Sequence, residues 1–222
     1  MFLAQVSEQK IKATFDKGAV YNIGNQKDVE KKLVELTRTS KIEDAWLYDG
    51  KRLVDIGYRE TEFLKDPRGN TFVTTNYSDI KKNAVGQERV TLYHLHQANP
   101  DNPTYLFTPQ DIEFALKTKS RLKKDGMTPK FEYKMACPDG IYSLTIDAGL
   151  MKAYVTQKDN FVDYVLVETT KKEFEIINGR DDKARFFKSA REMSLDDKEE
   201  LRAIQLSALE SIGIKVIFEK IN

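Results

Sequence analysis

Two kinds of periodicity alternate along the sequence, and this alternation restricts the fold more than any other feature. In the segment 25–39, Val29, Leu33 and Leu36 recur at helical spacing, which predicts an amphipathic helix. Runs rich in β-branched and aromatic residues predict strands over 45–48, 52–58, 71–77, 89–96, 131–136, 141–146, 152–156 and 161–169. Strands and helices mixed in this way predict the α/β class, with helices flanking a sheet.

Signals for the start and the end of a helix frame the segment 109–124. The segment follows Thr108-Pro109-Gln110-Asp111, where threonine suits the N-cap, proline the first helical position and aspartate the reciprocal capping position. Asp125-Gly126 then ends the predicted helix. Further along, Pro138-Asp139-Gly140 separates two strand runs and predicts a hairpin.

The character of the sequence changes after Asn178. The segments 181–193 and 194–212 predict two helices, and the second has Ser194 as N-cap, Asp197 as its capping partner and Gly213 as its end. A closing strand is expected over 214–218, and one or two strands over 2–21. No linker rich in Pro, Gly or Ser divides the chain, so we expect a single domain over 1–222.

Charge and hydropathy argue against two classes of partner. The 36 basic and 35 acidic residues nearly cancel, which gives no support to nucleic-acid binding. No long apolar run predicts a membrane span, and the N-terminus does not have the pattern of a signal peptide. The one cysteine, Cys137, cannot form an internal disulfide and fits a reducing compartment. These features predict a cytoplasmic protein.

The only two histidines of the chain stand two residues apart, in Tyr93-His94-Leu95-His96. Residues i and i+2 of a strand project from the same face, so both imidazoles can converge on one metal ion. The alternative is a pair of histidines whose hydrogen bonds are satisfied within the fold. The residues themselves leave these two readings about equally favoured.

Asp111 can complete a ligand set with these histidines. Two imidazoles and one carboxylate suit a catalytic zinc ion with an open fourth position. Two histidines cannot build a three-histidine zinc site, and the sequence has neither an HExxH segment nor paired Cys-x-x-Cys motifs. Carboxylates must therefore finish any such site. Asp111 has a second reading as the capping partner of Thr108 alone, although the two roles are compatible.

The histidine pair followed by Thr108-Pro109-Gln110-Asp111 resembles the metal signature of the JAMM (JAB1/MPN/Mov34) metallopeptidases, with threonine in place of the usual serine. The resemblance implies a curved mixed sheet, a catalytic core over 25–157 and a C-terminal helical extension over 178–222. It implies zinc held by His94, His96 and Asp111. Glu43, upstream of the histidines, would be the proton shuttle, and Thr108 would donate to the oxyanion.

The expected activity is hydrolysis of peptide or isopeptide bonds by metal-activated water, with ubiquitin-like conjugates among the candidate substrates. Glu60 and Glu62 are alternative general bases. Two other functions stay open at this point. The chain could be an inert scaffold or partner-binding module of the same fold, or it could hydrolyse another substrate such as a phosphoester. Phosphoester hydrolysis usually requires two metals, and the sequence offers no clear second ligand set.

Overall fold

A computed structural model describes residues 19–39, 43–58, 74–97, 104–189 and 191–221 of the protein. Contacts along the chain divide it into two compact units. The first comprises Met1–Ala98, Ser120–Ile141 and Phe218–Asn222, and the second comprises Asn99–Lys119 and Tyr142–Ile217. The predicted core over 25–157 and the predicted extension over 178–222 stay predictions.

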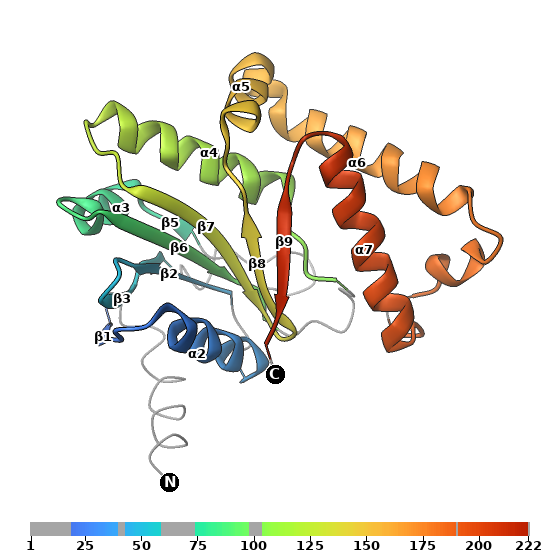
Figure 1. The fold of residues 1–222 in the computed structure, drawn as a ribbon, viewed down its shortest axis with the longest axis horizontal. Coiled ribbons are helices and arrows are strands. Elements are labelled where there is room, and N and C mark those ends of the chain that lie inside the picture. Colours follow the sequence, from blue (N-terminus) through green and yellow to red (C-terminus); the bar gives the residue numbers. More distant parts are fainter. Residues whose placement is uncertain (1–18, 40–42, 59–73, 98–103, 190, 222) are drawn as a thin grey trace, which may run out of the picture. The chain divides into compact units, whose positions relative to one another are not determined.

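The main sheet has seven strands (Figure 1). In spatial order its strands are β1 (Val20–Asn22), β3 (Arg52–Asp55), β2 (Asp44–Tyr48), β6 (Arg89–Leu95), β7 (Lys130–Cys137), β8 (Gly140–Leu144) and β9 (Val216–Lys220). Strand β6 runs parallel to β7 and antiparallel to β2, so the sheet is mixed. The predicted α/β class is therefore confirmed. A separate pair joins β4 (Gly57–Tyr58) to β5 (Thr74–Thr75).

Helix α2 (Gln26–Thr39) covers one face of the strands of the first unit (Figure 1). Its start is capped by Asn25, whose side chain accepts a 2.9 Å hydrogen bond from the backbone of Lys27. The apolar stripe predicted from the sequence packs into a core formed by Val29, Leu33, Val34, Trp46, Tyr48, Leu53, Tyr93, Leu95, Ala136 and Ile141. The helical spacing of that stripe therefore places α2 on the sheet.

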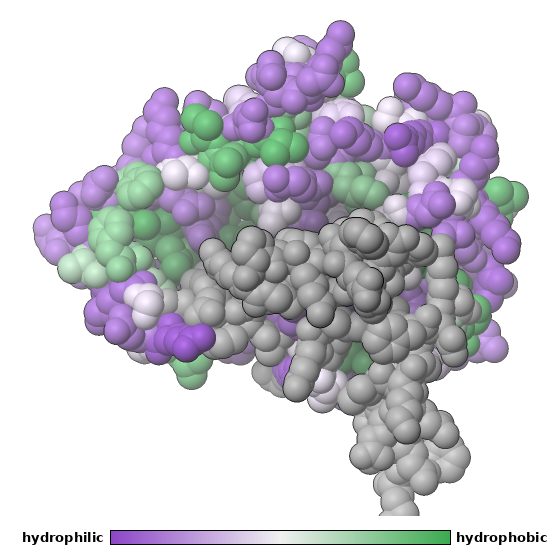
Figure 2. Space-filling model, turned by 180° about the vertical axis from the view of Figure 1, so that it is seen from behind, coloured by the Kyte–Doolittle hydropathy of each residue, from purple (hydrophilic) through white to green (hydrophobic). Residues whose placement is uncertain are grey.

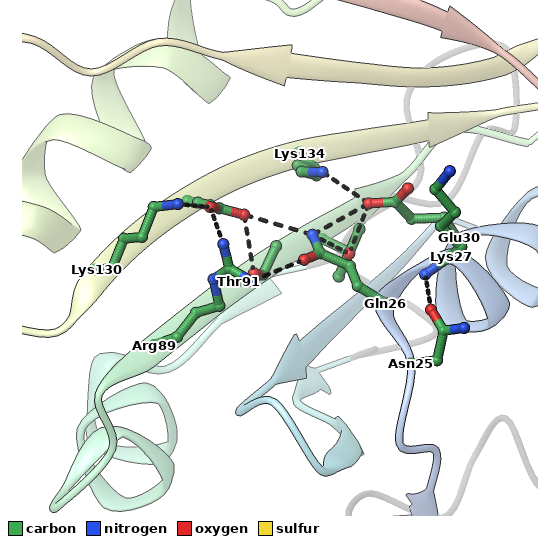
Figure 3. Close-up of polar contacts among 10 residues, drawn as sticks. Asn25, Gln26, Lys27, Glu30, Arg89, Thr91, Lys130 and Lys134 are labelled. Atoms are coloured by element: carbon green, nitrogen blue, oxygen red, sulfur yellow. Dashed lines mark hydrogen bonds and ion pairs between the residues drawn. The ribbon is translucent and has the colours of Figure 1, made fainter.

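A buried network of charged and polar groups lies between α2 and the strands β6 and β7 (Figure 3). Glu30 is only 4% exposed. Its carboxylate accepts hydrogen bonds from the ammonium of Lys134 at 2.7 Å, the phenol of Tyr93 at 3.1 Å and the amide of Gln26 at 3.2 Å. Burial, with the charge of Glu30 as the next cause, raises the pKa of the Tyr93 phenol well above its usual value.

Turns and a close approach fix the ends of the strands in the first unit. Gly50 has a φ of 96° in the turn between β2 and β3, where Asp49 accepts backbone hydrogen bonds from Lys51 and Arg52. The predicted hairpin between β7 and β8 is present. A Cβ atom at Gly140 would collide with the backbone oxygen of Glu219, so no larger residue fits there.

The second unit is mainly helical. It contains α5 (Ala148–Gln157), the short 3-10 helix η1 (Lys158–Asn160), α6 (Phe161–Asn178), a second 3-10 helix η2 (Lys183–Phe187) and α7 (Leu195–Ser211). An apolar cluster of Ile177, Phe186, Met193, Leu201 and Ile204 joins α6, η2 and α7. Helix α4 (Pro109–Lys124) begins in this unit.

Several predicted elements are confirmed. Helices occupy Gln26–Thr39, Pro109–Lys124 and Leu195–Ser211, and the last has the predicted capping box of Ser194 with Asp197. Chain reversal at Gly213, with a φ of 85°, follows α7 as expected, and a closing strand is present as β9. Most of the predicted strand material over 2–21, and part of that over 71–77, lies outside the described residues.

The strands predicted over 152–156 and 161–169 are wrong, because these residues form α5 and α6. The β-branched and aromatic composition of the run from Phe161 favours a strand. In the structure, Phe161 and Val165, one helical turn apart, are buried in α6, and Ile177 is buried near its end, so packing overrides strand propensity.

Two further differences concern helices. The helix predicted over 181–193 is wrong, since the regular structure there is limited to η2, after which Lys188 has an extended backbone. Helix α3 (Tyr77–Ala84), which Asn76 caps, is not predicted from the sequence. Ile80 and Ala84 are the buried residues of this short helix, too few to show a periodicity in the sequence.

On the face shown in Figure 2, hydrophilic residues predominate and apolar residues form separate patches. Within the described part of the chain, no helix is both long and apolar enough to cross a membrane.

The buried network makes a prediction about stability. Glu30→Leu should lower the free energy of unfolding by about 3 kcal/mol, because it leaves the Lys134 ammonium without its carboxylate in a largely buried position. Urea denaturation measures the change. Glu35→Leu on the exposed side of the same helix is the control and should stay within about 0.5 kcal/mol of the wild type.

The double variant Glu30→Leu/Lys134→Leu should recover part of the loss, because it removes both charges together. A Glu30→Leu protein as stable as the Glu35→Leu control would show that the network contributes nothing to folding.

Candidate metal centre

Strand β6 and the residue that follows it carry the two histidines on the face of the sheet opposite to α2. Tyr93 and Leu95 belong to the core beneath α2, so by alternation His94 points to the other side. His96 lies just beyond the end of β6, but its backbone N–H still bonds to the oxygen of Ala136 at 2.9 Å. The strand alternation therefore continues to His96, and both imidazoles share one face, as the sequence predicts.

The register of β2 brings a carboxylate to the same place. Asp44 pairs with Leu95 and Ala45 pairs with His94 in the antiparallel ladder. One step further along this register, Glu43 stands across from His96. Residues that face each other in an antiparallel pair project to the same side, so the Glu43 side chain joins the two imidazoles.

The three side chains form a tight group. The Nε2 atom of His94 and the Oε2 atom of Glu43 are 3.5 Å apart. The imidazole rings of His94 and His96 have centroids 4.7 Å apart and planes inclined by 77°. The side chains of His94 and Glu43 are 15% and 20% exposed, and His96 is 8% exposed. The group is therefore largely enclosed but keeps some exposure to solvent.

This geometry fits a metal ion. One ligand atom from each of the three residues lies within 4.8 Å of the other two. In a tetrahedral zinc site with bonds of about 2.1 Å, ligand atoms are separated by ~3.4 Å, so a small rotation of the side chains would complete the arrangement. Nitrogen and carboxylate donors together suit zinc and other divalent transition metals. Among the described residues, this is the one group of three or more potential ligands that converges in this way.

The surroundings of the group favour a stable ligand geometry. Ala45, the strand partner of His94, is small and leaves room for the imidazole beside it. On the opposite face, Trp46 pairs with Tyr93, and each side chain is at most 1% exposed. These two residues pack the strands against α2. The backbone that carries the ligands is thus fixed by a packed core on one side, which limits the entropy lost when a metal binds.

Thr108 and Asp111 form the predicted capping box at the start of α4. The Asp111 carboxylate accepts hydrogen bonds from the Thr108 backbone N–H at 2.8 Å and from its hydroxyl at 2.7 Å. The backbone N–H of Asp111 donates back to that hydroxyl at 3.2 Å. The box fixes the rotamer of Asp111, and in it the Thr108 hydroxyl donates its proton to the Asp111 carboxylate.

The roles assigned to these two residues stay predictions. Both belong to the second unit, whereas Glu43, His94 and His96 belong to the first. The alternative bases Glu60 and Glu62 lie outside the described residues.

The structure adds a possible role for Glu43. From the sequence this residue is predicted as a proton shuttle only, whereas the structure brings its carboxylate within reach of the ligand atom of His94. The signal was the antiparallel pairing of two predicted strands, 45–48 and 89–96, whose register decides which acidic residue meets the histidines. That register cannot be read from either strand alone.

Comparisons with protein-family models, with curated proteins and with solved structures find no match for this chain. The resemblance to the JAMM metallopeptidases therefore stays a prediction that rests on the residues of its motif.

The capping box predicts how α4 responds to substitution. Thr108→Val keeps the shape of the side chain but removes the hydroxyl that donates to Asp111, and it should cost about 1–2 kcal/mol of unfolding free energy. Thr108→Ser keeps the hydroxyl and should cost under about 0.5 kcal/mol. Chemical denaturation of the two variants tests this. Equal losses in both would mean that the methyl group, and not the hydrogen bonding, matters at this position.

Proposed function

We propose that this protein is a zinc-dependent hydrolase that cleaves peptide or isopeptide bonds, with a site similar to that of the JAMM metallopeptidases. The observation that carries the proposal is the convergence of Glu43, His94 and His96 on one face of adjacent strands. A structural zinc site is usually closed by four protein ligands, whereas a site with fewer keeps a position for water.

His94 and His96 would hold the ion through their imidazole nitrogens, and Asp111 would be the third ligand that the motif supplies. When bound, zinc supplies a Lewis acid that activates water near neutral pH. Glu43, 3.5 Å from the His94 nitrogen, would take a proton from the attacking water and return it to the leaving amine. Its side chain is 20% exposed, so water can reach it.

The remaining parts of the proposal follow from the same resemblance. The mixed sheet would be a curved, MPN-like sheet, and the C-terminal helices would be an addition to it. Thr108 would donate its hydroxyl to the oxyanion, and to do so it would have to release the hydrogen bond to Asp111. Ubiquitin-like conjugates in the cytoplasm are the first substrates to test.

Metal content is the first measurement. We expect one zinc ion per chain by elemental mass spectrometry, and its loss in His96→Ala, because the remaining ligands would bind the ion weakly. Gln97→Ala, a change at the next residue, is the matched control and should retain the zinc.

A His96→Ala protein that still binds one zinc ion would show that the ligands are different. Two metal ions per chain would instead favour a phosphoesterase.

Glu43→Gln separates the two roles that the geometry allows for this residue. If Glu43 is the general base, the variant should keep its zinc and lose about 100- to 10,000-fold in the rate of hydrolysis, because an amide cannot accept the proton. Cleavage of ubiquitin-like conjugates and of a panel of peptides measures the rate. Loss of zinc in the variant would make Glu43 a ligand.

The corresponding change of an acidic residue outside the group, Glu35→Gln, should alter neither zinc content nor activity. An inactive wild-type protein that carries zinc would favour the scaffold function over hydrolysis.

A further inference from the structure

The second unit contains a pocket that is separate from the histidine group. Its volume is about 160 Å³, and it opens between α6, α7 and the residues that lead into α4. The apolar part of its wall is formed by Phe107, Val165 and Leu209. The polar part is formed by Thr169, Glu173 and Gln205. An engineered cavity of about 150 Å³ in another protein binds benzene, so the space here suits a ligand of roughly five or six heavy atoms.

The polar groups of the pocket are mainly hydrogen-bond acceptors. The side chain of Gln205 forms a hydrogen bond with the Glu173 carboxylate, to which its amide N–H donates. The Oε1 atom of Gln205 and the Oγ1 atom of Thr169 are buried and have no hydrogen-bond partner within the described part of the chain. A buried acceptor without a donor is costly, and the Thr169 hydroxyl can accept as well as donate, so these two atoms favour a ligand that donates hydrogen bonds.

The charge of the pocket points in the same direction. Burial raises the pKa of the Glu173 carboxyl, and the hydrogen bond with Gln205 opposes that rise. A carboxylate in partly desolvated surroundings is stabilised by a cation and destabilised by an anion. An apolar ligand would desolvate the Glu173 carboxylate and would leave the Gln205 Oε1 atom without a donor.

We propose that the pocket between α6 and α7 binds a primary ammonium group at the end of a short apolar chain. The ammonium has three N–H donors, which match the Glu173 carboxylate, the Gln205 Oε1 atom and the Thr169 hydroxyl. The alkyl chain lies against Phe107, Val165 and Leu209. This binding site does not depend on the proposed hydrolase activity.

Two sources carry this chemistry, a free alkylamine and the side chain of a lysine residue. n-Butylammonium represents the first, and N-acetyl-lysine N-methylamide represents the second. The full chain is titrated with each by isothermal calorimetry at neutral pH. A pocket that admits a lysine side chain should bind both probes with similar affinity, and one that takes only a free amine should bind n-butylammonium alone.

The charge requirement is tested with a neutral probe of the same shape. 1-Butanol should bind at least tenfold more weakly than n-butylammonium, because it cannot neutralise Glu173. Glu173→Gln should weaken n-butylammonium binding at least tenfold. Glu175→Gln is the matched control, since Glu175 lies on the same helix but is 51% exposed and paired with Lys172. It should leave the affinity unchanged.

A second variant tests the pocket even if Glu173→Gln fails to fold. Gln205→Leu removes the buried acceptor and should also weaken n-butylammonium binding, with the far-ultraviolet circular dichroism spectrum as the check on folding for both variants. Absence of saturable n-butylammonium binding to the wild type would overturn the proposal. Equal binding by a folded Glu173→Gln protein, or equal affinity for 1-butanol, would overturn it as well.

Discussion

The antiparallel pairing of β2 with β6 sets the position of both the core and the candidate metal centre in the first unit. On one face, Trp46 and Tyr93 pair beneath α2, and on the other Ala45 stands beside His94. Because side chains alternate along a strand, a shift of one residue would exchange these faces and place the imidazoles in the apolar core. The packing of the core therefore fixes the register that keeps both imidazoles on the face opposite to α2.

The charged network under α2 makes this register more specific. Glu30 lies among the core positions of the helix, and only the particular arrangement of Lys134, Tyr93 and Gln26 satisfies its carboxylate. A buried charge without partners costs several kcal/mol, so alternative placements of α2 on the sheet are disfavoured. The network need not add net stability to serve this purpose. In the first unit, a polar interaction selects the arrangement that hydrophobic burial then stabilises.

Partly buried carboxylates in the two units have different surroundings. In the first unit, Glu43 lies beside two imidazoles, where a cation of high charge would balance it. In the second, Glu173 lies among acceptors and apolar side chains, where a singly charged ammonium fits better. The difference follows from the neighbours, since imidazole nitrogens are metal ligands and amide or hydroxyl oxygens are hydrogen-bonding groups. The same residue type thus predicts different ligands in different surroundings.

The sequence by itself determined the α/β class, helices α2, α4 and α7, and the shared face of His94 and His96, because these depend on local periodicity and capping. It misassigned α5 and α6, where apolar β-branched residues fit either a strand or a packed helix. Only the tertiary structure decided that Glu43 meets the histidines, that Glu30 is buried and that Glu173 lines a pocket. Each of these depends on the register or packing of segments far apart in the sequence, which no local pattern encodes.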